Sequence, residues 1–150
     1  MSDPSVTLHL VTAVNAHLLD RVAPNVFDHD VRPELLREFL ANPMNHLVVA
    51  VDEGTVIGMA SAISYVHPDK PLQLFVNEVG VAAAHRRRGI GKRLMAAVLD
   101  HGRRLGCTEA WVGTEAENEA ALALYRSTSP SLEERVVIFT YELGAEEQAG

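Results

Sequence analysis

The residues best suited to chemistry lie between positions 86 and 93. The run Arg86-Arg87-Arg88-Gly89-Ile90-Gly91-Lys92-Arg93 places five basic side chains around two glycines. It follows a stretch rich in β-forming residues (72–81) and opens a stretch with apolar residues at helical spacing (91–105). A glycine turn that begins a helix exposes unpaired backbone N–H groups at the positive end of the helix dipole, and these groups bind phosphate. The pattern therefore indicates a phosphate-binding turn, with a solvated basic helix start as the alternative.

The residue pattern of this turn excludes two common phosphate-binding motifs. A P-loop that ends at Gly91-Lys92 would need its first glycine at Arg86. A dinucleotide fingerprint that begins at Gly89 would need glycine at Leu94. What remains is Arg-x-x-Gly-x-Gly, directly after a predicted strand.

A carboxylate stands in the middle of that predicted strand. Glu78 has Val76 and Val79 as apolar neighbours, and burial of an unpaired charge is costly. Glu78 therefore either forms a structural ion pair or faces a cleft. In a cleft, burial would raise its pKa and make it a proton acceptor for an ammonium substrate. These residues alone leave both interpretations open.

Composition limits the class of protein. A chain of 150 residues with 47% hydrophobic residues is long enough for one domain with a real core. Its net charge of −7 disfavours a nucleic-acid partner and favours a cationic substrate, whereas the basic turn favours an anionic cofactor. One cysteine, Cys107, is typical of a reducing compartment. We find no secretory signal or apolar run of membrane-spanning length, so we expect a cytoplasmic protein without a membrane partner.

Hydrophobic periodicity and turn residues predict a single α/β domain with a mixed sheet. The expected strands cover residues 7–11, 46–51, 55–66, 72–81, 110–113 and 136–143. The expected helices cover residues 15–22, 33–41, 91–105 and 117–125. Asp52-Glu53-Gly54 predicts a tight hairpin and Gly106 a helix cap. We expect Trp111 in the core, and residues 144–150 as a loose polar tail.

Three features in this order resemble the GNAT family of acetyl-coenzyme A-dependent N-acetyltransferases. They are the strand Asn77-Glu78-Val79-Gly80-Val81, the turn from Arg86 to Gly91, and the helix that carries Asn118 and Leu124-Tyr125. The resemblance covers residues 45–143, the cofactor-binding core, and leaves residues 1–44 as the acceptor side. It implies a GNAT fold: a mixed sheet of about six to seven strands with about four helices. Strands four and five would be splayed, with a bulge at Gly80.

The resemblance also implies roles for individual residues. Backbone groups of Val79 and Val81 would pair with the pantetheine arm of acetyl-CoA, and Asn118 would contact the same arm. Glu78 would accept the amine proton, directly or through water, or hold the substrate amine, and Tyr125 would act as general acid near the sulfur. The pyrophosphate would lie on the backbone of the turn, which comprises Arg86, Arg87, Arg88, Gly89, Ile90, Gly91 and Lys92.

Other residues have less specific signals. Asp28 and Asp30, in the loop before the second helix, would hold ammonium groups of the substrate, or they are ordinary loop acids. Tyr125 also fits simple packing against the sheet, and Lys92 and Arg93 also fit a solvated helix surface. Cys107 fits a small core residue better than a nucleophile. The seven histidines show no metal-ligand spacing, so we expect no metal.

The short connection after Tyr125 and the acid at Glu78 make the chain similar to small aminoglycoside 3-N-acetyltransferases. This implies acetyl transfer by direct attack of a primary amine in a small cationic substrate, which suits the negative charge of the chain. Polyamines, other small amines and protein amino groups remain alternatives. A non-catalytic acyl-CoA-binding module and a nucleic-acid-binding module are the rival classes, and a homodimer is left open.

Overall fold

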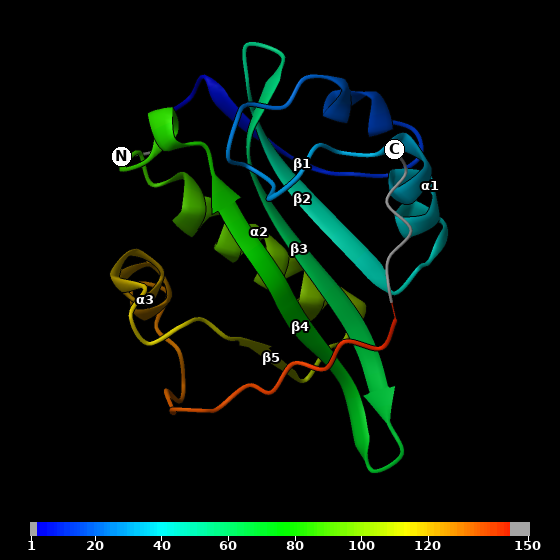
Figure 1. The fold of residues 1–150 in the computed structure, drawn as a ribbon, viewed down its shortest axis with the longest axis vertical. Coiled ribbons are helices and arrows are strands. Elements are labelled where there is room, and N and C mark those ends of the chain that lie inside the picture. The colour runs from blue at the N-terminus through cyan, green and yellow to red at the C-terminus, as the bar shows by residue number, and fades with distance from the viewer. Residues whose placement is uncertain (1–2, 145–150) are drawn as a thin grey trace.

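The computed structural model describes residues 3–144 and has the α/β architecture with a mixed sheet that the sequence predicts (Figure 1). Five strands lie in the order β1-β2-β3-β4-β5. The pairs β1-β2, β2-β3 and β3-β4 are antiparallel, and the pair β4-β5 is parallel. The strands are β1 (Val6–Leu10), β2 (Asn45–Asp52), β3 (Thr55–His67), β4 (Lys70–Val81) and β5 (Glu109–Val112).

Three α-helices and two 3₁₀ helices complete the described part of the chain. They are η1 (Ala16–Asp20), α1 (Pro33–Ala41), η2 (Ala83–His85), α2 (Ile90–Leu105) and α3 (Glu119–Arg126). The helix predicted at residues 15–22 is thus a short 3₁₀ helix. None of the helices within residues 3–144 has the length and apolar character needed to cross a bilayer. Of the tail predicted at residues 144–150, residues 145–150 lie outside the described residues.

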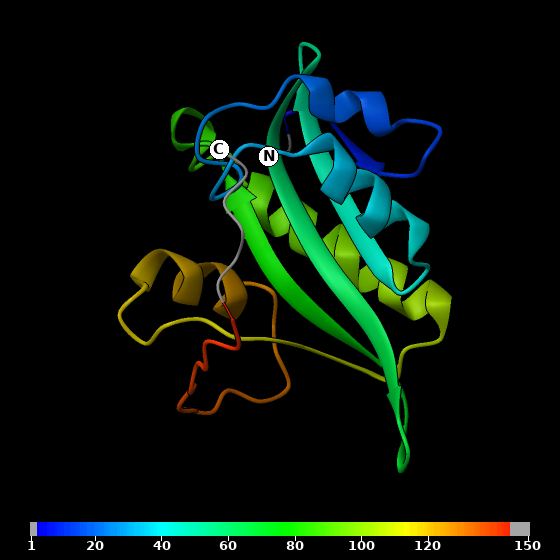
Figure 2. The ribbon, with the colours of Figure 1, turned by 45° about the vertical axis from the view of Figure 1, so that its right-hand side comes forward.

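The two helical layers lie on opposite faces of the sheet (Figure 2). Helix α2 packs Leu94 and Val98 into one core cluster, which also contains Val76. On the other face, η1, α1 and the loop between them cover a second cluster around Met59 and Val49. Because β2 is buried along most of its length on both faces, it anchors the two layers together.

The hairpin between β2 and β3 is as tight as predicted. Glu53 and Gly54 are its two turn residues, with φ angles of 49° and 77°. Two positive φ angles in a two-residue turn are typical of type I′, which matches the twist of the strands that it joins.

The bulge in β4 is not at Gly80, where we predicted it. Ser61 pairs with Glu78 and Ala62 pairs with Val76, so Asn77 is the extra residue. Gly80 pairs regularly with Met59. The pairing of β4 with β5 ends at Val76, so the two strands separate at the bulge, as the predicted splay requires.

Two further predictions are wrong. Residues 136–143 form no strand, and their apolar side chains are exposed, so the described sheet has five strands instead of six or seven. The local sequence has high β-propensity, but a strand also needs a pairing partner and buried surface to offset the loss of chain entropy. Trp111 is 48% exposed instead of lying in the core, because the short edge strand β5 is open to solvent. It stacks on Phe75 with a ring-centroid distance of 4.2 Å and donates a hydrogen bond to the Tyr65 hydroxyl.

Candidate active site

The backbone of β4 beyond the bulge offers hydrogen-bonding groups toward the space that β5 leaves. The N–H of Ala82 donates to Ile57 O at 2.8 Å, which turns the backbone groups of Ala82 toward β3. Because these directions alternate along a strand, those of Val79 and Val81 point away from β3. The Arg86 side chain reaches Val81 O at 3.4 Å. An extended acyl arm laid along this edge would therefore find backbone partners, as we predict for pantetheine.

Glu78 lies on the face of the sheet that the loop between η1 and α1 covers. Side chains alternate along a strand, so Glu78 and Gly80 share one face. The loop is fastened to β3 by hydrogen bonds from Val56 N–H to Arg21 O and from Ala23 N–H to Val56 O, both 2.8 Å long. It then crosses β4 directly over Gly80 with Val26, which is 1% exposed.

Charges at this crossing act on one another. Burial raises the pKa of Glu78, and the nearby Asp28 carboxylate raises it further. Burial also raises the pKa of the Tyr125 hydroxyl, and the charge of Glu78 adds to that shift. Glu78 is therefore within electrostatic reach of both Asp28 and Tyr125, two residues predicted from other parts of the sequence.

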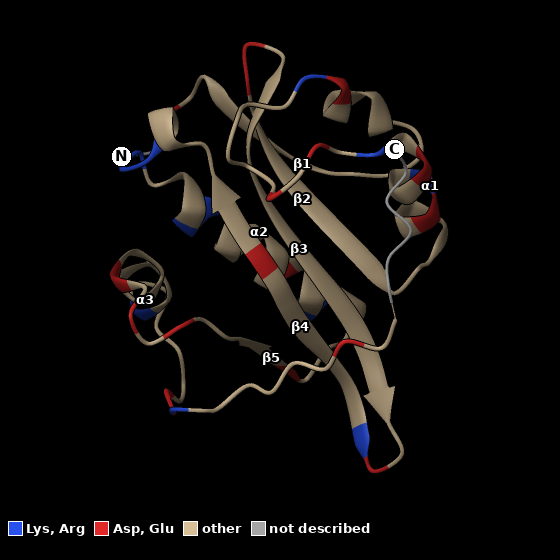
Figure 3. Ribbon diagram, viewed as in Figure 1, with Lys and Arg blue, Asp and Glu red and all other residues tan. Residues whose placement is uncertain are grey.

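The structure weighs against the structural ion pair as the role of Glu78. No cation within residues 3–144 lies at ion-pair distance from its carboxylate. Figure 3 shows a single acidic band in the otherwise uncharged middle of β4. A half-buried carboxylate with a raised pKa can accept a proton at neutral pH. Asp30 is exposed, and its contact with substrate stays a prediction.

The basic turn has a backbone shape suited to an anion. Arg87 and Gly89 both adopt left-handed conformations, with φ angles of 64° and 73°, and α2 begins immediately afterwards. Gly89, at the N-cap position, provides no side-chain hydrogen bond to the helix. The first N–H groups of an α-helix have no partner within the helix. The turn can therefore present those of Ile90, Gly91 and Lys92 to a phosphate.

The side chains of this turn differ in their surroundings. Arg86, Arg87 and Lys92 are exposed, whereas Ile90 is buried in the core. Gly91 packs against the third helix, because a Cβ there would lie 3.2 Å from Leu124 Cδ2.

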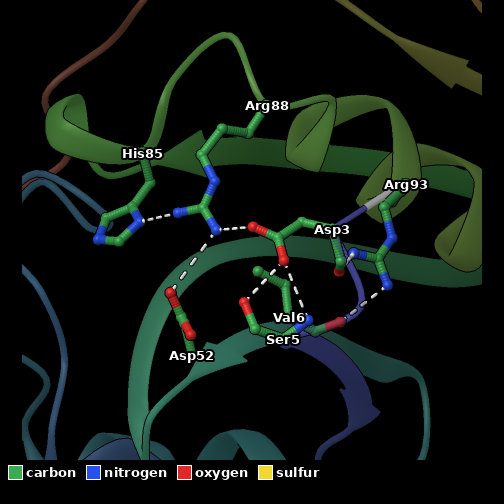
Figure 4. Close-up of polar contacts among 7 residues, drawn as sticks. All are labelled: Asp3, Ser5, Val6, Asp52, His85, Arg88 and Arg93. Atoms are coloured by element: carbon green, nitrogen blue, oxygen red, sulfur yellow. Dashed lines mark hydrogen bonds and ion pairs between the residues drawn. The ribbon is translucent and has the colours of Figure 1, made fainter. Parts of the chain in front are cut away.

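Two other arginines have fixed partners that sequence reasoning missed. Arg88 forms ion pairs with Asp3 and Asp52 (Figure 4). Arg93, which also fitted a solvated helix surface, is half-buried and donates to backbone oxygens near the N-terminus. No local signal identifies such pairs, since Asp3 and Arg88 are 85 residues apart in the sequence.

Asn118 has a structural role at the start of α3. Its side-chain oxygen accepts a hydrogen bond from Ala121 N–H at 3.0 Å, which is a standard N-cap. Its contact with pantetheine stays a prediction. Seven residues later, Tyr125 is half-buried against the core cluster that α2 forms.

Cys107 is poorly suited to nucleophilic attack. Its N–H donates to Gly102 O at 2.9 Å, as part of the cap that Gly106 makes with a φ of 91°. Burial raises the pKa of its thiol, which reduces the fraction of reactive thiolate. Within residues 3–144 no three histidine, cysteine or acidic side chains are grouped as a metal would require.

Comparison with known proteins identifies the family. The profile of the acetyltransferase (GNAT) family matches residues 14–128. The chain belongs to the GNAT family. N-alpha-acetyltransferase RimI of Mycobacterium tuberculosis is 35% identical to this chain over 124 residues, which is 81% of this chain and 76% of RimI. Human N-acetyltransferase 8 is 34% identical over 97 residues, which is 63% of this chain and 42% of that protein.

Solved structures agree with the GNAT fold. An aminoglycoside acetyltransferase from an uncultured soil metagenomic sample, in complex with trehalose, superposes with a TM-score of 0.81 at 23% identity. The alignment covers 95% of this chain and 99% of that one. Aminoglycoside N-acetyltransferase AAC(6')-Iy in complex with CoA gives a TM-score of 0.72 at 25% identity, with 91% and 94% of the two chains covered. The predicted likeness to aminoglycoside acetyltransferases is thus confirmed, and the enzyme is an N-acetyltransferase by family.

Proposed function

We propose that this GNAT enzyme transfers the acetyl group of acetyl-CoA to a primary amine of a small, cationic, aminoglycoside-like substrate by direct attack. The observation that carries the proposal is the position of Glu78. It lies just past the bulge where β4 and β5 separate. Burial and the Asp28 charge raise the pKa of Glu78, and the Glu78 charge in turn raises the pKa of Tyr125.

The co-substrate fits the residues present. The turn from Arg86 to Lys92 would hold the pyrophosphate through its backbone N–H groups. Val79 and Val81 would pair with the pantetheine arm, and one of their N–H groups would polarise the thioester carbonyl. The complex of AAC(6')-Iy with CoA, the product that acetyl-CoA leaves after transfer, supports this assignment, since that protein has a similar fold.

The amine would enter beneath the loop that crosses Gly80. Asp28 and Glu78 attract its ammonium group, and Glu78 accepts the proton directly or through one water. The neutral nitrogen then attacks the thioester carbon, the new N–C bond forms, the C–S bond breaks, and the nitrogen loses its second proton to water. The Tyr125 hydroxyl is protonated at neutral pH, and its raised pKa strengthens that state. It can give this proton to the departing sulfur and regain one from water.

A protein amino terminus is the second candidate acceptor. The observation that favours it is the 35% identity to RimI, which is named as an N-alpha-acetyltransferase. Polyamines would also satisfy the two carboxylates. We place the reaction in the cytoplasm, where a protein with one cysteine stays reduced. Sedimentation of the purified protein would show whether it is a monomer or a homodimer.

An amine panel tests the proposal. Purified protein is incubated with acetyl-CoA and with aminoglycosides, polyamines or peptides with free amino termini. Thiol release and the mass of the product are then measured. We expect the fastest thiol release with an aminoglycoside, and the position of the acetyl group in the product would test the predicted 3-N transfer. Binding of CoA without thiol release for any amine would instead favour the non-catalytic acyl-CoA module.

A further inference from the structure

Arg88 lies within the turn from Arg86 to Lys92, yet its side chain points toward two carboxylates (Figure 4). Its guanidinium pairs with Asp3 and lies 3.7 Å from Asp52 Oδ2, and His85 Nδ1 accepts a hydrogen bond from it at 2.6 Å. The side chain is 30% exposed. Two negative charges therefore surround one positive charge, so Arg88 adds little net attraction for a phosphate.

Asp3 also connects to the first turn of α2. Arg93, four residues after Gly89, donates to Asp3 O at 3.2 Å and to Val6 O at 2.9 Å. Asp3 itself is fixed by hydrogen bonds from the N–H and hydroxyl of Ser5. The hydrogen bond from Arg88 is the largest cause that lowers the pKa of Asp3 to about 2, so its carboxylate is charged at neutral pH. The N-terminal segment thus contacts both the turn and the helix start.

The residues on either side of Arg88 explain why this anchoring matters. Arg87 has a φ of 64° and Gly89 a φ of 73°, so a left-handed residue stands before and after it. A non-glycine residue keeps such a conformation only where its surroundings fix it. The contacts of Arg88 fix the middle of the turn, and those of Arg93 fix its end.

We propose that Asp3 and Asp52, acting through Arg88, are positioning residues for acetyl-CoA. Their contacts keep the backbone N–H groups of the turn in the phosphate-binding arrangement, and Arg88 supplies shape instead of charge. The inference rests on the proposed function, because it presumes that the turn binds the cofactor.

One substitution tests this inference, because the two explanations predict opposite changes in CoA affinity. Asp3→Asn removes a negative charge near an anion site, so simple electrostatics predicts tighter CoA binding. Positioning predicts the opposite. Calorimetry should show CoA affinity lowered about tenfold, because the strained turn relaxes when its anchor is lost. The double variant Asp3→Asn/Arg88→Gln should bind CoA at least as tightly as the single variant with the lower CoA affinity, because both changes remove the same contact.

Further measurements separate positioning from phosphate contact. Dephospho-CoA should lose affinity by the same factor as CoA, whereas a contact with the 3′-phosphate would spare dephospho-CoA. In turnover, KM for acetyl-CoA should rise while kcat stays within about twofold. Asp100→Asn is the matched control: it removes the same charge from an exposed pair with Arg104 and should leave affinity unchanged.

Parental or tighter CoA binding by Asp3→Asn would overturn the inference. If the parent protein itself does not bind CoA, the proposed function is wrong instead. If the Asp3→Asn variant does not fold, the CoA affinity of Arg88→Lys decides between the two explanations. Lysine keeps the positive charge but lacks the planar guanidinium that joins the two carboxylates. A positioning role therefore predicts the same tenfold loss of CoA affinity, whereas direct phosphate contact predicts near-parental affinity.

Discussion

The carbonyl oxygen of Val26 lies so close over Gly80 that a Cβ on Gly80 would be 2.3 Å from it. This contact lets the loop between η1 and α1 cross β4 two residues from Glu78. The same loop carries Asp28, whose charge raises the pKa of Glu78. The acceptor side of the proposed site therefore depends on the absence of one side chain.

Gly80→Ala should displace this loop, because the added methyl group meets backbone and not a flexible side chain. We expect kcat/KM for the amine to fall at least about tenfold as the carboxylates are misplaced. The free energy of unfolding should decrease by about 1–3 kcal/mol. CoA affinity, measured by calorimetry, should stay nearly constant. Gly113→Ala is the control, since a Cβ there meets no atom within 4 Å. Parental amine kinetics in Gly80→Ala would contradict this account.

Glu78→Gln keeps the size of the side chain but removes its basicity. We expect kcat/KM for the amine to fall most at neutral pH and to recover partly as rising pH deprotonates the amine in solution. CoA affinity should change little, because the phosphates lie at the far end of the pantetheine arm. A pH series of initial rates measures this. Glu109→Gln, an exposed carboxylate on β5, is the control. Parental rates in Glu78→Gln would leave proton transfer to water or to Asp28.

Asp28→Asn refines the same test. The parent's kcat/KM should rise with pH as Glu78 ionises, at a pH above the ordinary range because burial and Asp28 raise its pKa. Without the Asp28 charge, that pKa falls and the acid limb of the profile should shift to lower pH. A limb that stays in place would mean that another group controls it.

Gly89→Val should weaken CoA binding sharply. A β-branched residue is strained at a φ of 73°, even though a Cβ there meets no protein atom. Gly106→Val imposes similar strain at the opposite end of α2, where φ is 91°. Thermal melts should show both variants destabilised, and calorimetry should show CoA affinity lost only in Gly89→Val. Equal CoA binding by the two would place the phosphates elsewhere.

Cys107→Ala should leave turnover nearly intact, since burial raises the pKa of the thiol and direct attack needs no acetyl-enzyme. Steady-state rates with acetyl-CoA and the best amine measure this. A loss of more than about a hundredfold, roughly 2.7 kcal/mol of transition-state stabilisation, would instead support a covalent intermediate.

A pair of adjoining histidines, His46 buried and His101 half-buried, should make the fold sensitive to acid. His46 contacts the Ser64 hydroxyl at 2.8 Å, and His101 lies 3.0 Å from its other ring nitrogen. Burial, and then the neighbouring His101, lower the pKa of His46; burial, and then Arg104, lower that of His101. The unfolded chain thus binds protons more readily, and stability should decrease as pH falls below about 6.5. His46→Gln should flatten the dependence of Tm on pH between 7 and 5, whereas the exposed His17→Gln should not.

Much of the fold follows from local patterns. The Glu53-Gly54 turn and the α2 helix were predictable because turn residues and a 3.6-residue period act within a few positions. The bulge was assigned to Gly80 because glycine tolerates irregular backbone. The structure shows that Gly80 instead makes room for Val26, a contact across more than fifty residues that no local pattern reveals.

The other differences have the same origin. Residues 136–143 have the composition of a strand, but pairing depends on which edge of the sheet they meet. Trp111 is apolar, but its exposure depends on what covers β5. The sequence also placed Arg88 in the predicted phosphate-binding turn, but nothing nearby in the sequence indicates that Asp3 and Asp52 hold its side chain. Glu78 was easier to identify, because a carboxylate among valines is unusual in itself.

The separation of β4 from β5 has a consequence for how this enzyme can evolve. Beyond the point of separation, the loop at residues 21–30 crosses β4 at Gly80, and β4 leads into the turn at residues 86–91 before α2. Two segments far apart in the sequence thus lie at this end of β4. In the proposed site, selection can therefore alter the loop, and with it the range of amines accepted, while the turn assigned to the cofactor stays unchanged. New acceptor preferences would then arise by drift in a short surface segment, without any rebuilding of the catalytic centre.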